Sequence, residues 1–145
     1  MNLKRHIKNS FELRGAIIGM LMGDLCISRK TEKHNAYFLM THSKEQKTYM
    51  EFKSDILGMK DVVTMKHRSR ETYLAKTDKT YEQYQCHSNN NAYATSIYEY
   101  CYCSGVKIVN EKILNSITDF GLFLWYLDDG YLNVRYYKNT NKIKE

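Results

Sequence analysis

Two long apolar segments, one near each end of the chain, dominate the pattern of hydrophobic and polar positions. The first, over 13–24, is apolar on nearly every side of the helix that it predicts, and Ser10 is placed to cap that helix. The second, over 119–130, has the same character, with Thr118 as its predicted cap. A helix without a polar face must be buried, so both segments are predicted to be interior helices.

Three glycines in the first segment, Gly15, Gly19 and Gly23, recur at every fourth position. This spacing places them on one face of a helix, where the absence of side chains lets another backbone approach closely. Each glycine costs roughly 1 kcal/mol of helix propensity relative to alanine. The glycines therefore predict a close helix partner, and the second apolar segment is the plausible one.

Between the two helices the apolar positions recur at every second residue, which indicates strands. Segments 25–30 and 36–42 flank a polar turn and predict a hairpin. Segments 62–70 and 80–88 are joined by a polar loop and predict a second pair of strands.

A helix is predicted after each pair of strands. The first begins at a capping box over 43–46 and ends at Gly58. The second covers 91–104 and ends at Gly105, and a short helix over 110–117 follows it. The order helix, two strands, helix, two strands, helices predicts an α+β fold with an antiparallel sheet.

The second pair of strands carries long polar side chains at alternating positions. One face is predicted to hold Thr64, Lys66, Arg68 and Arg70, and Val63 and Met65 are predicted to point to the other. On the partner strand, alternation places together Tyr81, Gln83, Gln85 and His87. Such donors suit the groove of a nucleic acid, although a solvated outer face of a sheet has the same pattern and stays open as an alternative.

Composition changes this picture only in part. The 145-residue chain has 22 Lys and Arg against 16 Asp and Glu, a net charge of +6, which suggests a polyanionic partner without requiring one. No segment has the length of a membrane span and the N-terminus has no apolar signal core, so we expect an intracellular protein with no membrane partner. The cysteines have no CxxC spacing, so reduced thiols are expected rather than a zinc site: Cys26, Cys86, Cys101 and Cys103.

The two acidic helices and the strands between them resemble the LAGLIDADG homing endonucleases. The first copy of the motif is Ile17-Ile18-Gly19-Met20-Leu21-Met22-Gly23-Asp24-Leu25, with Leu25 in place of the closing glycine. The second copy is Leu122-Phe123-Leu124-Trp125-Tyr126-Leu127-Asp128-Asp129-Gly130, which keeps the acid and the closing glycine but has bulky residues where the first has small ones. The resemblance covers essentially the whole chain.

The resemblance implies the LAGLIDADG fold, in which each αββαββα subdomain has an antiparallel four-stranded sheet that lies over the DNA major groove. Residues 1–117 are expected to form the first subdomain, and 118–145 only the first helix and first strand of a second, the strand over 131–138. A complete enzyme of this kind needs about another repeat. Three explanations stay open: a fragment of a longer reading frame, which we favour, a decayed enzyme, or a half that associates with another chain.

By the same resemblance, Asp24 and Asp129, one from each motif helix, are expected to be catalytic and to bind Mg²⁺. A divalent ion between a carboxylate and a phosphate activates the attacking water and neutralises the leaving oxygen. Asp128 is expected either to support this site indirectly or to be solvated. Many family members place a lysine near the active site in the stretch that holds Lys107, although an ordinary surface lysine fits that position equally well.

The implied function is site-specific cleavage of double-stranded DNA. The residues expected to contact DNA are Ser28, Lys30, Lys66, Arg68, Arg70, Gln83, Gln85 and His87. Two alternatives stay open: an RNA maturase that acts on intron RNA with the same fold, and a DNA-binding module that has lost the chemistry. A reverse transcriptase is excluded, because the acids of Tyr126-Leu127-Asp128-Asp129 end an apolar helix rather than occupy a hairpin turn.

Overall fold

The computed structural model describes residues 5–130 and, of the chain beyond them, the backbone of two short strands. Its helices are α1 (Ser10–Met22), the 3₁₀ helix η2 (Lys44–Gln46), α2 (Lys47–Gly58), α3 (Ala92–Cys101), α4 (Glu111–Leu114) and α5 (Asp119–Asp129). Its strands are β1 (Cys26–Ser28), β2 (Tyr37–Ser43), β3 (Met65–Leu74), β4 (Lys79–Ser88), β5 (Tyr102–Cys103), β6 (Val106–Lys107), β7 (Arg135–Tyr136) and β8 (Ile143–Lys144). The α+β class predicted from the sequence is confirmed.

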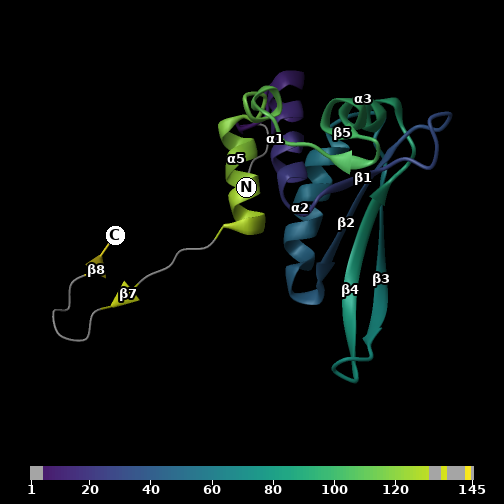
Figure 1. Cartoon of the computed structure of the whole chain (residues 1–145), viewed down its shortest axis with the longest axis vertical. Coiled ribbons are helices and arrows are strands. Elements are labelled where there is room, and N and C mark those ends of the chain that lie inside the picture. The colour runs from purple at the N-terminus through teal and green to yellow at the C-terminus, as the bar shows by residue number, and fades with distance from the viewer. Residues whose placement is uncertain (1–4, 131–134, 137–142, 145) are drawn as a thin grey trace.

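A four-stranded sheet with the order β1-β2-β4-β3 forms one side of the molecule, and its strands all pair antiparallel. In Figure 1 the helices α2 and α1 lie on one side of this sheet, and α5 lies beyond α1. The long β3–β4 hairpin extends past the ends of the helices. The sheet therefore has one face covered by helices and one face free of them.

The core lies between the sheet and the first two long helices. Phe38, Met40 and Cys86 point inward from the sheet and are almost fully buried, as are Ile56 and Leu57 of α2. Helix α1 is buried at nearly every position from Leu13 to Leu21, as predicted for a helix without a polar face. Among the described residues, no helix is long and apolar enough to cross a membrane.

Helices α1 and α5 pack with their backbones in close contact, as the glycine spacing predicted. A Cβ on Gly19 would overlap the carbonyl oxygen of Gly121, and one on Gly15 would lie 2.9 Å from the carbonyl oxygen of Ser116. A Cβ on Gly23 would overlap the side chain of Asp128. The contacts advance along both helices in the same direction, so the two helices run parallel and their C-terminal ends lie together.

Helix α5 differs from the prediction on its other side. It buries Phe120, Gly121 and Leu124 against the rest of the protein, whereas exposed fractions of 44–56 % are found for Leu122, Phe123, Tyr126 and Leu127. Burial on all sides was therefore wrong for this helix within the described part of the chain, because only α1 covers it extensively there.

Two predicted helix caps were wrong. Asn9 caps α1, because its side-chain oxygen accepts the backbone N–H of Glu12 at 2.9 Å, and Ser10 is the first helical residue. Ser43 makes no side-chain capping bond; the chain forms the 3₁₀ helix η2 before α2 begins at Lys47. Thr118 caps α5 as predicted, through the N–H of Gly121.

The second hairpin is longer than predicted. Strand pairing continues to Leu74 and Lys79, so the expected loop shrinks to a turn in which Asp78 adopts a positive φ of 49°. Paired β-branched and aromatic residues, Thr72 with Tyr81 and Tyr73 with Thr80, favour this extension.

The helix expected over 91–104 ends at Cys101, because the chain turns back through the β5–β6 hairpin. Ser104 and Gly105 form its turn with φ values of 50° and 80°, so Gly105 belongs to a turn rather than a helix stop. The short helix expected over 110–117 is the single turn α4, capped by Asn110. The strand expected over 131–138 lies largely outside the described residues; of it, β7 is described and pairs with β8.

Candidate active site

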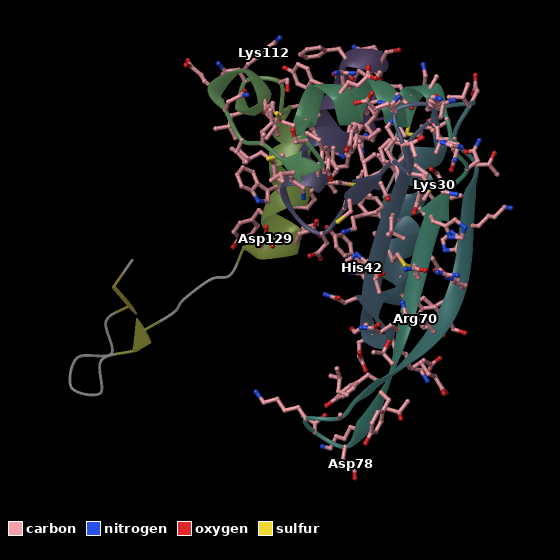
Figure 2. The ribbon with its side chains drawn as sticks, turned by 45° about the vertical axis from the view of Figure 1, so that its right-hand side comes forward. Lys30, His42, Arg70, Asp78, Lys112 and Asp129 are labelled. Atoms are coloured by element: carbon pink, nitrogen blue, oxygen red, sulfur yellow. The ribbon has the colours of Figure 1, made fainter. Side chains whose placement is uncertain are left out.

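The C-terminal ends of α1 and α5 are joined by a hydrogen bond. The backbone N–H of Asp24 donates to the Oδ2 atom of Asp128 at 3.0 Å. Because Asp129 follows Asp128 directly, the two acids that the motifs single out, Asp24 and Asp129, lie at the same end of one helix pair. Figure 2 shows Asp129 at this end of α5.

Both of these acids are accessible. The side chain of Asp24 is 42 % exposed, and its Oδ2 atom lies 3.7 Å from Nδ1 of His42. Asp129 is exposed and accepts the indole N–H of Trp125 at 3.2 Å. The carboxylates can therefore reach a ligand beyond the helix ends.

Asp128 is buried, so the alternative that it is solvated is wrong. Its side chain is 0 % exposed, and its Oδ1 atom accepts from Lys53 Nζ and from the Tyr49 hydroxyl, each at 2.9 Å. Burial and this bond to Asp128 raise the pKa of Tyr49 far above its usual value. Asp128 and Asp129 thus have opposite environments, as neighbouring helical residues that face in different directions should.

His42, from β2, lies beside the same cluster. Its side chain is 1 % exposed, its Nδ1 atom lies 3.2 Å from Oε1 of Gln46, and its Nε2 atom has no hydrogen-bond partner among the described residues. Burial, and then the charge of Lys53, lower the pKa of His42. Both effects favour the neutral form of the imidazole.

Lys107 reaches the end of α1 from strand β6. Its Nζ atom donates to the carbonyl oxygen of Leu21 and lies 3.5 and 3.3 Å from those of Gly23 and Leu25. A cation at the C-terminal end of a helix is favourable because the helix dipole is negative there. Lys107 therefore lies against the carbonyl groups of the two residues that flank Asp24 in the chain.

The polar side chains predicted for the sheet lie together on its free face. Lys66 pairs with His87, Arg68 with Gln85 and Arg70 with Gln83 across β3 and β4. The opposite face carries Met40, Tyr84 and Cys86, and is covered by the helices. The predicted alternation is therefore confirmed.

The centre of this face is held by hydrogen bonds. Arg68 Nε donates to Oε1 of Gln85 at 2.6 Å, and Nε2 of Gln85 donates to Thr41 Oγ1 at 3.3 Å. A shallow hollow at this point is lined by Tyr37, Leu39, Arg68, Gln85, His87, Ser88 and Asn90. Among the described residues, none of Lys66, Arg68 and Arg70 forms a salt bridge, so all three charges are available to an anionic ligand.

The remaining two predicted DNA contacts lie at the other edge of the sheet. Ser28 is the last residue of β1 and pairs with Tyr37. Lys30 is exposed in the turn that follows β1, as Figure 2 shows.

The donor set at the helix ends suits Mg²⁺ better than a metal that needs several protein ligands. No group of three or more His, Cys, Asp or Glu side chains that could hold a metal is present in residues 5–130. Mg²⁺ prefers oxygen ligands and is commonly held by one or two carboxylates, waters and the phosphates of its substrate. Two accessible carboxylates fit this pattern.

Sequence analysis did not identify Lys53, Tyr49 or His42 as part of this site. Lys53 carried a signal, because it lies on the apolar stripe of α2 between Tyr49 and Ile56, where a charged residue needs a buried partner. His42 carried no such signal, because the alternation of a strand shows only which face a residue lies on and not which partners it has there.

Comparison with known proteins shows the family and the fold. A sequence model of the LAGLIDADG DNA endonuclease family matches residues 14–144, and the chain belongs to that family. The structure resembles that of the homing endonuclease I-WcaI bound to its DNA recognition sequence, with a TM-score of 0.71 and 17 % identity over 95 % of this chain and 59 % of that one. This likeness shows that the fold is that of a LAGLIDADG homing endonuclease.

A curated relative is Protein RecA of Mycolicibacterium flavescens, 27 % identical over 120 residues. The match includes 82 % of this chain and 26 % of that protein. The chain therefore spans about a quarter of the length of this relative and about three-fifths of the I-WcaI chain.

Proposed function

We propose that this chain acts in a homing endonuclease that cleaves double-stranded DNA at a specific site by Mg²⁺-dependent hydrolysis of phosphodiester bonds. The observation that carries the proposal is the pair of accessible carboxylates, Asp24 and Asp129, at the same end of two tightly packed motif helices. Membership of a DNA endonuclease family supports it.

Asp24 and Asp129 are the residues that would hold Mg²⁺. When bound, the ion supplies an activated water and neutralises charge on the leaving oxygen. The chain's own contribution is to present both carboxylates, one from each motif helix. Lys107 adds a positive charge beside Asp24 that favours the approach of a phosphate.

The free face of the sheet is the proposed DNA-binding surface. Arg and Gln side chains form two-point hydrogen bonds with base edges, whereas Lys contacts mostly phosphate. On this basis specificity is assigned to Arg68, Arg70, Gln83 and Gln85, and positioning on the duplex to Ser28, Lys30, Lys66 and His87. The bond that Arg68 donates to Gln85 and the bond that Gln85 donates to Thr41 hold these side chains in place before DNA binds.

We propose that residues 1–117 form the first subdomain and that residues 118–145 begin the second. The exposed apolar face of α5 supports it, since a second subdomain could pack there and its own sheet would bind the other half of the site. Further residues of the same protein or a second chain can supply that subdomain.

The test is a cleavage assay on a plasmid that carries the host gene without the inserted element. When the second subdomain is supplied, we expect linearisation at one position with Mg²⁺, none in EDTA, and none on a plasmid that retains the insertion. The 145-residue chain alone should bind DNA weakly and cut poorly. The matched variants are Asp24→Asn and Asp55→Asn, the latter an exposed acid on α2. Binding to intron RNA without DNA cleavage would support the maturase alternative, and equal cleavage by Asp24→Asn would contradict the assigned site.

A further inference from the structure

A buried ion pair beneath the motif helices has no part in the proposed chemistry. Lys53 of α2 and Asp128 of α5 are both 0 % exposed in their side chains, and Nζ lies 2.9 Å from Oδ1. The ammonium group also lies 4.8 Å from the centre of the Tyr49 ring. Removing two charges from water is costly, and apolar residues of similar size often stabilise a protein as well or better. The presence of the Lys53–Asp128 ion pair beneath the motif helices therefore suggests a role beyond stability.

The carboxylate of Asp128 has both oxygens engaged. Oδ1 accepts from Lys53 and from the Tyr49 hydroxyl, which fixes the side chain from the side of α2. Oδ2 accepts the backbone N–H of Asp24 at 3.0 Å. Gly23 makes room for this arrangement, since a Cβ there would overlap Asp128.

The bond to Asp24 is distinct from the other bonds at the end of α1. The N–H groups of Gly23 and Leu25 both donate to the carbonyl oxygen of Met20 within the same helix. The N–H of Asp24 instead points to α5. The position of the residue that bears the first motif carboxylate is therefore set by Asp128, and Asp128 is held in turn by Lys53 and Tyr49.

We propose that Asp128, itself held by Lys53 and Tyr49, is a positioning residue that orients Asp24 for metal binding. This inference rests on the proposed function of Asp24. The ion pair also neutralises one of three carboxylates gathered where two helix dipoles present their negative ends, so Asp24 and Asp129 face less repulsion. Substitution of a residue that orients a metal ligand through a hydrogen bond typically lowers metal affinity or activity by about 10–100-fold.

The competing explanation is that the pair only holds α2 against α5. Two double variants separate the two roles: Lys53→Met with Asp128→Asn, and Lys53→Met with Asp128→Ala. Both remove the two buried charges together, which avoids leaving one unpaired. Only the Asn variant keeps an oxygen that can accept the N–H of Asp24.

The first measurement is hydrogen exchange of individual backbone amides by NMR, with no metal or DNA present. In the positioning role, the Asp24 amide exchanges slowly in the wild type and in the Asn double variant. It exchanges at least about tenfold faster in the Ala double variant, while the amides of Gly23 and Leu25 stay as in the wild type. Equal exchange of the Asp24 amide in the two double variants would overturn the inference.

The second measurement is the Mg²⁺ dependence of plasmid cleavage. The Ala double variant should need more Mg²⁺ or cleave about 10–100-fold more slowly than the Asn double variant at matched thermal stability. Equal Mg²⁺ titrations would also overturn the inference. If even the wild type does not cleave, the proposed nuclease function fails, and the exchange experiment alone decides whether Asp128 positions Asp24.

Tyr49→Phe serves as a milder variant that leaves no charge unpaired. It removes one donor to Asp128 and keeps the ion pair, so the Asp24 amide should exchange only a few-fold faster. An effect as large as that of the Ala double variant would show that Tyr49, rather than Lys53, holds Asp128 in place.

Discussion

The α1–α5 interface and the free face of the sheet differ in how they use side chains. At the interface, Gly19 and Gly121 have no side chains, so the two helix backbones come into contact. On the sheet, long side chains such as Lys66 and Arg70 extend away from the backbone without a charged partner among the described residues. The first region brings two carboxylates to the same end of a helix pair, and the second leaves the positive charges of its long basic side chains free.

This difference predicts how each region responds to substitution. A close backbone contact cannot relax, so a single added carbon should have a large effect there. An exposed polar face has room for change, so single substitutions should weaken binding by small, separable amounts.

The largest effect is expected for Gly19→Ala. Its new methyl group would overlap the backbone of Gly121, so α1 and α5 must separate, and we expect a loss of about 3 kcal/mol or more in the free energy of unfolding. Urea denaturation measures this. Gly58→Ala is the matched control, because nothing lies within 4 Å of its Cβ position, and it should be neutral or slightly stabilising. Equal stability of the two variants would contradict the close contact.

The next largest effect is on cleavage rather than on folding. Asp24→Asn should lower the Mg²⁺-dependent cleavage rate by about a hundredfold or more, because a metal-binding charge is lost. DNA affinity in EDTA and thermal stability should stay close to the wild type, since the carboxylate of Asp24 is exposed. A parallel loss of stability would show that the carboxylate supports the fold instead.

A smaller effect is expected on the sheet. Lys66→Ala should weaken binding to a DNA duplex by about threefold to tenfold and lower the salt dependence of log affinity by about one. Lys112→Ala, on α4 at a distance from this face in Figure 2, is the control and should change neither quantity. Fluorescence anisotropy at several salt concentrations makes the comparison. A larger change for Lys112 would place the DNA elsewhere.

The smallest expected effect concerns His42, on the inner face of the sheet. Its pKa is lowered by burial and by Lys53, against weaker opposing effects of Gln46, Asp24 and Asp128. The unfolded chain therefore takes up a proton below about pH 6.5 that the folded protein does not. Stability should fall as the pH drops below 6.5, by less than about 1.4 kcal/mol per pH unit.

Urea denaturation in EDTA at pH 7.5 and 5.5 measures this dependence. His42→Asn should remove part of it, whereas His34→Asn, at an exposed turn position, should leave it unchanged. Identical pH profiles for wild type and His42→Asn would contradict the assigned shift.

Much of the fold could be predicted from local patterns in the sequence. The glycine spacing of α1 predicted a backbone contact that the structure contains, and alternation predicted which side chains share the free face of the sheet. The errors were at boundaries. Asn9 and Ser10 are both good caps, and the choice between them depends on where the chain enters the helix. The length of the β3–β4 hairpin depends on cross-strand pairs that a single strand does not reveal.

The sequence by itself determined the two motif helices, the family and the free polar face, because these follow from periodicity and from residue type. Only the tertiary structure decided that Asp128 is buried against Lys53 while Asp129 is exposed, and that Lys107 reaches the end of α1. Both depend on which surfaces of α5, α2 and β6 meet. A side chain's partners from distant parts of the chain are fixed by packing, and no local pattern specifies them.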